Sequence, residues 1–205
     1  MRKVSFLALA LALVVAGTAN AQVYNEVGDA SGLLPGQAVT GPTSQIVGSL
    51  STTDSEDLFS FLWGGGVLTI DTFGSGFDTQ LHLFDGSGAG IGENDDAAVG
   101  GLQSEISLDL AAGSYFIGLT PFNNDALDAA GGSIFGFTNT FDDLNGNFIQ
   151  GPENDPAGVL AGWDSPGIPG GDYVINFSES VSVPEPTSTL ILLGTAGLAL
   201  VRRRR

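Results

Sequence analysis

Between residues 57 and 119, apolar and polar side chains alternate in short runs, and a glycine-rich or aspartate-rich turn closes each run. In residues 67–73, for example, Leu68 and Ile70 share one face of an extended chain, and the residues between them share the other. A period of two is typical of antiparallel strands that bury one face. A slip of one residue would expose every buried side chain, so the register is well specified. The alternation predicts an all-β sandwich over residues 46–180.

The distribution of charge excludes several kinds of partner. The chain has 6 basic and 23 acidic residues and a formal net charge of −17. The basic residues are Arg2, Lys3, Arg202, Arg203, Arg204 and Arg205. Residues 22–183 therefore contain no Lys or Arg, which disfavours binding to nucleic acid or to an anionic membrane surface and favours divalent cations. With no cysteine, the chain has neither disulfides nor thiolate metal ligands.

The first 21 residues have the three parts of a secretory signal peptide. Arg2 and Lys3 precede an apolar run over residues 4–16, and Ala19 and Ala21 form an A-x-A cleavage site. We expect signal peptidase to cut after Ala21. The alternative, an N-terminal membrane helix, would need about 20 apolar residues.

The candidate metal ligands are acidic residues in two turns. Glu93, Asn94, Asp95 and Asp96 form the densest acidic loop, and Asp54 and Asp57 precede an apolar strand. Calcium takes six to eight oxygen ligands from carboxylates, Asn side chains and backbone carbonyls. Asn and Asp also cap ordinary solvated turns, which is the alternative interpretation of Glu93–Asp96. We expect these residues to bind Ca²⁺ that stabilises the fold.

The single histidine, His82, lies between Leu81 and Leu83 in a predicted strand. If the two leucines face the core, His82 faces the other way. No second histidine is present to complete a ligand set, so we predict a solvated residue on the outer face rather than a catalytic or metal-binding one.

The segments that flank the alternating region give weaker signals. We interpret residues 22–45 as an extended lead-in with one edge strand. We interpret residues 172–178 as a closing strand with Tyr173 on its buried face. From residue 121 to 171 the pattern weakens. There Asn145-Gly146 predicts a β-hairpin, in preference to a calcium loop, because Phe148 replaces the glycine that such a loop needs.

Three segments together resemble the bacterial pre-peptidase C-terminal domain. In order they read GSLSTTDSEDLFSF, VLTIDTFGSGFDTQLHLFDGSGAGIGENDDA and LDLAAGSYFIGLT. The similarity covers about residues 45–119, and the lead-in Glu26-Val27-Gly28-Asp29 fits the usual start of that domain. The resemblance implies an antiparallel jelly-roll-like sandwich without catalytic activity, often calcium-binding and used as an accessory or adhesion module.

The last 23 residues form a three-part tail. Val183, Pro184, Glu185 and Pro186 precede an apolar run over residues 190–201, and Arg202 to Arg205 follow. A helix over residues 188–201 would be about 21 Å long, short for a hydrocarbon core about 30 Å thick, with its arginines on the cytoplasmic side. The tail resembles the PEP-CTERM sorting signal, which implies transient insertion into the inner membrane and processing by exosortase. A permanent C-terminal anchor is the alternative.

These observations divide the chain into a signal peptide (1–21), a lead-in (22–45), a β-sandwich (46–180) and a sorting tail (183–205). We predict a non-enzymatic protein of the cell surface or extracellular matrix, associated with extracellular polysaccharide. The alternative class is a secreted hydrolase resembling glycosidases, since paired carboxylates are the one catalytic apparatus that this composition supplies. Against this alternative, the sequence contains no G-x-S-x-G nucleophile motif and no thiol.

Overall fold

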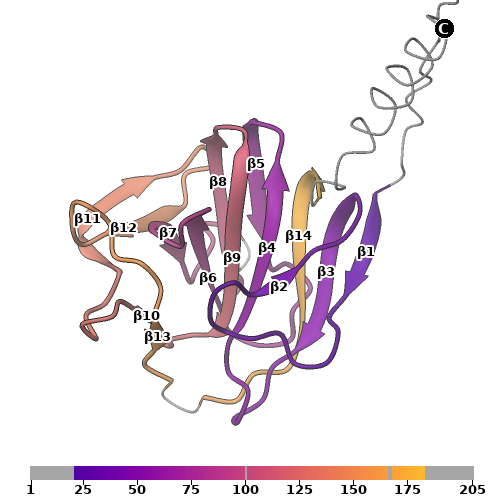
Figure 1. Cartoon of the computed structure of the whole chain (residues 1–205), viewed down its shortest axis with the longest axis horizontal. Coiled ribbons are helices and arrows are strands. Elements are labelled where there is room, and N and C mark those ends of the chain that lie inside the picture. The colour runs from indigo at the N-terminus through magenta and orange to yellow at the C-terminus, as the bar shows by residue number, and fades with distance from the viewer. Residues whose placement is uncertain (1–20, 100, 166–167, 183–205) are drawn as a thin grey trace, which may run out of the picture.

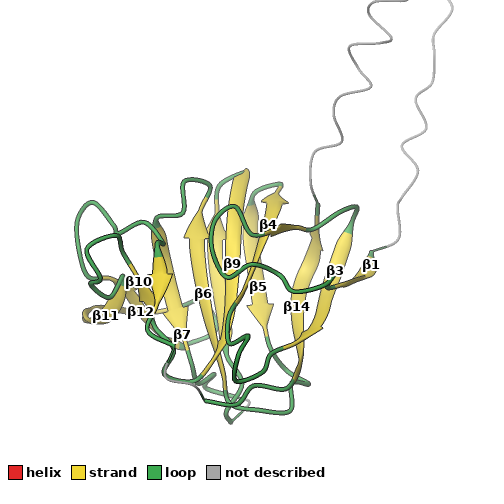
Figure 2. Ribbon diagram, turned by 60° about the horizontal axis from the view of Figure 1, so that its bottom comes forward, coloured by secondary structure: helices red, strands yellow, loops and turns green. Residues whose placement is uncertain are grey.

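The computed structural model describes residues 21–99, 101–165 and 168–182 (Figure 1). Strands and loops make up this part of the chain, which contains no α-helix (Figure 2). The predicted all-β sandwich is confirmed. Ala21 is exposed. The other parts of the predicted signal peptide, including Ala19, and the predicted tail from Val183 to Arg205 lie outside the described residues.

One layer of the sandwich is a five-stranded sheet in the order β1-β3-β14-β5-β8. Its strands are β1 (Gln22–Asn25), β3 (Thr43–Ser49), β14 (Asp172–Val181), β5 (Gly66–Asp71) and β8 (Glu105–Leu110). β1 lies at an edge, as predicted for the lead-in, and the closing strand β14 lies in the centre. Thr43 pairs with Gln22 on one side and with Val181 on the other, so the first and last strands enter and leave at the same end of the domain.

The other layer is a seven-stranded sheet in the order β11-β12-β7-β6-β9-β4-β2. Its strands are β11 (Phe135–Asp142), β12 (Phe148–Pro152), β7 (Gly90–Asn94), β6 (Thr79–Asp85), β9 (Gly113–Pro121), β4 (Asp57–Trp63) and β2 (Gln37–Ala38). Two pairs at sheet edges, β1–β3 and β2–β4, are parallel rather than antiparallel. Parallel neighbours need a long connection, which the lead-in and β3 provide.

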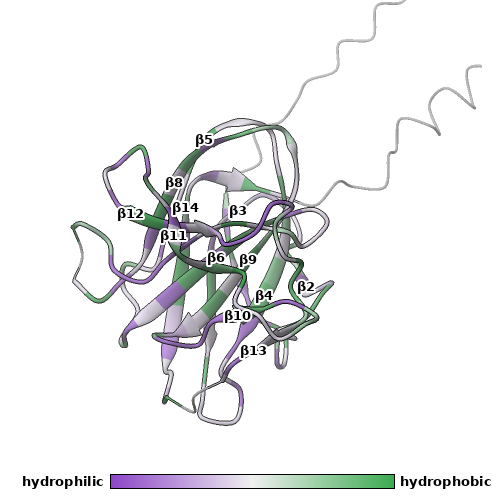
Figure 3. Ribbon diagram, turned by 90° about the vertical axis from the view of Figure 1, so that its left-hand side faces the viewer, coloured by the Kyte–Doolittle hydropathy of each residue, from purple (hydrophilic) through white to green (hydrophobic). Residues whose placement is uncertain are grey.

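The two sheets pack face to face around one hydrophobic core. Alternate residues of each strand point into it, such as Phe59 and Phe61 of β4 and Leu81 and Leu83 of β6. Tyr173 of β14 meets them from the other sheet. Figure 3 shows hydrophobic residues along β4, β6 and β9 in the middle of the domain. Each fully buried side chain of this size contributes about 1.5–3 kcal/mol, so the core is the main source of stability.

A second hydrophobic cluster covers the outer face of the seven-stranded sheet. Leu58 and Phe84 point outward from the sheet and pack against residues of the 121–165 segment. Their partners are Ala126, Ile134, Phe135, Leu160 and Trp163. Two short strands of this segment, β10 (Ala126–Leu127) and β13 (Gly162–Trp163), pair with each other. The segment with the weakest sequence pattern therefore forms a covering layer.

The prediction that His82 is solvated is wrong, because this covering layer buries the face on which it lies. His82 is 0% exposed, and the edge of its ring contacts Trp163 at a centroid distance of 4.9 Å. Its Nδ1 lies 2.9 Å from Oε2 of Glu93, the residue opposite it on β7, and neither atom has a further hydrogen-bond partner among the described residues. Nε2 lies 3.1 Å from Oγ1 of Thr120.

The hairpin predicted at Asn145-Gly146 is confirmed. β11 and β12 pair antiparallel, with Asp142 opposite Phe148. The connection is wider than a two-residue turn, because Asp143 Oδ1 accepts the backbone N–H groups of both Asn145 and Asn147.

We expect His82→Ala to lower the free energy of unfolding by about 3 kcal/mol or more, because it leaves the Glu93 carboxylate buried without a partner. Replacing both residues with leucine should cost less than His82→Ala, since no charge is then left buried. Urea denaturation followed by far-UV circular dichroism measures both, with the exposed Glu179→Gln as control. Equal losses in the single and double variants would contradict a role for the unpaired charge.

Candidate metal site

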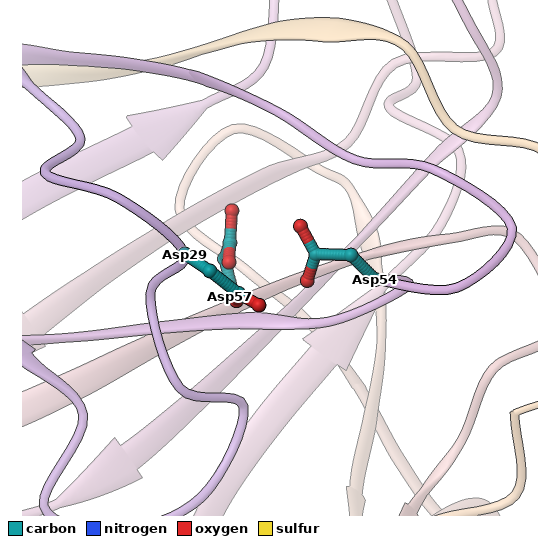
Figure 4. Close-up of side chains that lie close together, drawn as sticks. All are labelled: Asp29, Asp54 and Asp57. Atoms are coloured by element: carbon teal, nitrogen blue, oxygen red, sulfur yellow. The ribbon is translucent and has the colours of Figure 1, made fainter.

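Asp29 of the lead-in meets Asp54 and Asp57, which lie at the start of β4, at one end of the sandwich. Asp29 lies in the loop after β1, Asp54 in the turn before β4, and Asp57 is the first residue of β4. One carboxylate oxygen from each lies within 4.8 Å of the others (Figure 4). Asp29 is exposed, Asp54 is half-buried and Asp57 is buried, so the cluster reaches from solvent into the protein.

The loop that carries Asp29 is held in place by Glu26. The backbone N–H of Ala30 donates to Glu26 Oε1 at 3.0 Å, and that of Ser49 at the end of β3 donates to Oε2 at 3.1 Å. Gly28 has φ +73°, a left-handed conformation that glycine adopts without strain. Glu26 thus ties the lead-in to the sandwich and sets the position of Asp29.

Asp57 has only part of the hydrogen bonding that a buried carboxylate needs. The hydroxyl of Tyr173 donates to Oδ2 at 2.6 Å, across from the other sheet. Oδ1 is buried and has no hydrogen-bond partner in the part of the chain that the structure describes. Asp57 is 0% exposed, so water compensates little. Burying a carboxylate oxygen without a partner is costly, so Oδ1 is an unused ligand atom on a side chain that lies beside two other carboxylates.

The clustering changes the acidity of these groups. Burial, followed by the effects of Glu26, Asp54 and Asp29, raises the pKa of Asp57 from 3.8 to about 8, although the Tyr173 hydrogen bond opposes this rise. Burial and the neighbouring Asp29 carboxylate raise the pKa of Asp54 to about 6. Burial and Asp57 also raise the pKa of Tyr173, which keeps its hydroxyl proton and remains a donor. No Lys or Arg is present in the domain to relieve the repulsion.

This donor set suits a hard divalent cation. Three carboxylates provide up to six oxygen atoms, and Ca²⁺ takes six to eight oxygens from carboxylates, carbonyls and water. The unpartnered Oδ1 of Asp57 and the exposed side of Asp29 fit an ion that is bound by protein on one side and by water on the other. A cation would also offset the burial and the repulsion that together raise both pKa values.

The structure separates the sequence-predicted metal ligands into two places. Asp54 and Asp57 lie together, whereas Glu93 faces His82. Asn94 is buried, where its Oδ1 accepts the N–H of Glu105 and its Nδ2 donates to the carbonyl oxygen of Phe148.

Asp95 is half-buried and Asp96 is exposed, and the carboxylate of Asp95 accepts the N–H of Asp96. The sequence analysis did not include Asp29 among the candidate ligands, although Gly28-Asp29 is a turn-forming pair in the lead-in.

The comparisons with known proteins identify the tail. Residues 182–205 match the family model described as the PEP-CTERM protein-sorting motif. The chain carries a PEP-CTERM sorting motif. This motif implies an exported protein that is sorted through its C-terminal tail by exosortase. The match includes the predicted motif Val183–Pro184–Glu185–Pro186 and the four terminal arginines.

The solved structures include one that is similar to this chain, the pre-peptidase C-terminal domain of collagenase from Bacillus anthracis. The two share 11% sequence identity with a TM-score of 0.38, over 79% of this chain and 100% of the other. No curated protein matches the chain. The described part of the chain contains no helix long and apolar enough to cross a membrane.

In the presence of a chelator, we expect the melting temperature to fall as the pH rises from about 4 to 9. Both pKa values are raised in the folded protein, so the stability linked to the protonated carboxyls is fully present below the ordinary value of 3.8. It is lost as the pH rises through about 6 and about 8. Asp57→Asn, which has no charge to lose, should flatten this fall, whereas Glu179→Gln should not. Differential scanning calorimetry across this pH range tests it, and parallel curves for both variants would contradict it.

Proposed function

We propose that this exported protein is a non-enzymatic component of the cell surface or extracellular matrix, stabilised by Ca²⁺ and associated with extracellular polysaccharide. The observation that carries the calcium part is the buried, unpartnered Oδ1 of Asp57 beside Asp29 and Asp54. The sorting motif supports the location. An ion bound by these residues would join the lead-in loop to the start of β4 and so would close this end of the sandwich.

The cavity beside the three aspartates supports a non-enzymatic role. It has a volume of about 450 Å³ and is lined by Asp29, Ser31, Gly32, Leu33, Thr53, Asp54 and Glu56. A glycosidase uses a carboxylate pair on either side of a bound sugar ring, commonly held by further contacts to its hydroxyls and faces. In this lining the carboxylates of Asp29 and Asp54 lie within 4.8 Å of each other, and no aromatic side chain is included. A cation site explains the grouping better than an acid and nucleophile pair does.

We expect millimolar calcium to raise the melting temperature relative to chelator at matched ionic strength. An ion that binds only the folded state stabilises it by about 2.7 kcal/mol at 100 times its Kd. Asp29→Asn and Asp57→Asn should each remove most of the calcium-dependent shift, because each deletes a charged ligand. Glu93→Gln should leave the shift largely intact, since Glu93 faces His82. A shift that survives Asp57→Asn and disappears in Asp95→Asn would move the site to the Glu93–Asp96 loop.

The geometry at the end of β14 supports a tail that acts separately from the fold. Ser182 forms a bridge with Leu62 of β4 through their backbone groups. Pro184 and Pro186 follow at once, and neither can donate to a continuing ladder. Within the described residues, the last backbone hydrogen bonds of the domain are those of Ser182, directly before Val183–Pro184–Glu185–Pro186. Removing the tail should change where the protein goes without changing its fold.

Replacing Pro184-Glu185-Pro186 with alanines should hold the protein at the inner membrane with Arg202 to Arg205 intact, while the unaltered protein loses them. The reason is that exosortase requires the motif, the apolar run and the arginines together. Cell fractionation with mass spectrometry of the C-terminal peptide measures both outcomes, and the melting temperature of the domain should not change. A complete tail on surface-located wild-type protein would favour a permanent anchor instead.

A further inference from the structure

A second cavity lies beside β8 and the β11–β12 hairpin, with lining residues entirely different from those of the aspartate cluster. Its volume is about 340 Å³, at the lower end of the range of about 300–1,000 Å³ that small-molecule sites occupy. It is lined by Phe73, Ala98, Val99, Glu105, Asn145 and Asn147. The cavity therefore combines apolar walls with one carboxylate and two amides.

The polar side of the cavity is held rigidly by a shared carboxylate. Glu105 Oε1 accepts hydrogen bonds from Nδ2 of Asn145 and Nδ2 of Asn147, both at 2.8 Å. Asn147 Oδ1 in turn accepts the N–H of Ala98 at 2.8 Å, which ties the loop that carries Ala98 and Val99 to the hairpin. A preorganised wall of this kind loses little side-chain entropy when a ligand binds.

The polar atoms that remain free are chiefly acceptors. Within the described residues, no hydrogen bond reaches Oε2 of Glu105 or Oδ1 of Asn145. A ligand must therefore bring donors, and a cationic donor gains most because its hydrogen bond to a carboxylate is charge-assisted. The absence of Lys and Arg from residues 22–183 adds a long-range attraction for positively charged ligands.

The apolar side distinguishes an organic cation from a metal ion. Phe73 is 37% exposed and Val99 is 83% exposed, so both present hydrophobic surface. A hydrated divalent cation gains nothing from such surface, because it takes oxygen ligands. A saturated ring with an ammonium group fits both sides, since its C–H face can lie on the aromatic ring of Phe73.

We propose that this cavity binds a protonated amino-sugar unit of a polysaccharide. The ammonium group donates to Glu105 Oε2, a ring hydroxyl donates to Asn145 Oδ1, and the apolar face of the sugar packs on Phe73. This inference rests on the proposed association with extracellular polysaccharide and gives it a site and a sugar class. A Lys side chain of a protein partner shares the charge, but it is a thin chain with a single donor group and fills less of a 340 Å³ cavity.

The test uses the exported, processed protein in calcium buffer near pH 6 and low salt, titrated calorimetrically with a glucosamine tetramer. The N-acetylated tetramer and a tetralysine peptide are the comparison ligands. Glu105→Gln keeps the acceptor for both asparagines but removes the charge, and we expect it to weaken binding about tenfold or more. Phe73→Ala should weaken binding several-fold. The matched controls, Glu179→Gln and the 42%-exposed Phe122→Ala, should bind as the wild type does.

The outcomes separate the site from the wider function. Wild-type binding that is stronger for the glucosamine tetramer than for either comparison ligand, and that is lost in the cavity variants with unchanged melting temperatures, supports the proposal. Equal binding by Glu105→Gln and the wild type overturns the site, and equal binding of tetralysine overturns the sugar class. If the wild type binds polysaccharide extracted from the producing cells but not the tetramer, this inference fails while the proposed function stands. If it binds neither, both fail.

Discussion

The domain must stabilise its buried carboxylates without a single Lys or Arg. An acidic group in a protein interior is stable only when charges or hydrogen bonds replace the water that it loses. Neutral donors stabilise Asp143. Its Oδ1 accepts the N–H groups of Asn145 and Asn147, and its Oδ2 accepts the N–H of Ser107 and the side-chain amide of Asn147. Glu93 is stabilised differently, by contact with the chain's only histidine.

Two carboxylates, those of Asp57 and Asp143, also join the two sheets of the sandwich. On one side, the Tyr173 hydroxyl of β14 reaches across to Asp57 of β4. On the other, Asp143 in the β11–β12 hairpin accepts the backbone N–H of Ser107 in β8. Figure 1 shows β1 to β3 at one side of the domain and β11 to β12 at the other. The two sheets are therefore joined at both sides by hydrogen bonds to carboxylates as well as by the core between them.

Asp57 is a buried carboxylate that protein donors leave incompletely satisfied. Neighbouring acids oppose its ionisation, and its Oδ1 has no partner among the described residues. A structure that satisfies Asp143 with four hydrogen bonds leaves Asp57 with one. That contrast is the physical basis for placing a cation beside Asp29, Asp54 and Asp57. The cavity at Glu105 lies in a separate place, so ion binding and sugar binding would act independently.

Local patterns were enough for the strands between residues 57 and 119 and for the tail. Alternation defined the inward residues of β5, β6 and β8, because a period of two has one consistent register when one face is buried. The Pro-Glu-Pro motif, apolar run and arginines identified the sorting signal, since its recognition depends on local sequence. Asp54 and Asp57 were found for the same reason, as neighbours in one turn.

Only the tertiary structure decided how distant segments meet. The burial of His82 depends on the 121–165 segment, whose sequence pattern is weak because it packs through scattered residues such as Leu160 and Trp163. Asp29 joins Asp54 and Asp57 only because the lead-in returns beside the start of β4, a contact with no periodic signal in the sequence. Sequence alone therefore determined an exported all-β protein with an acidic surface. The folded chain decided which acids meet and which of them are buried, because both depend on every segment that packs around them.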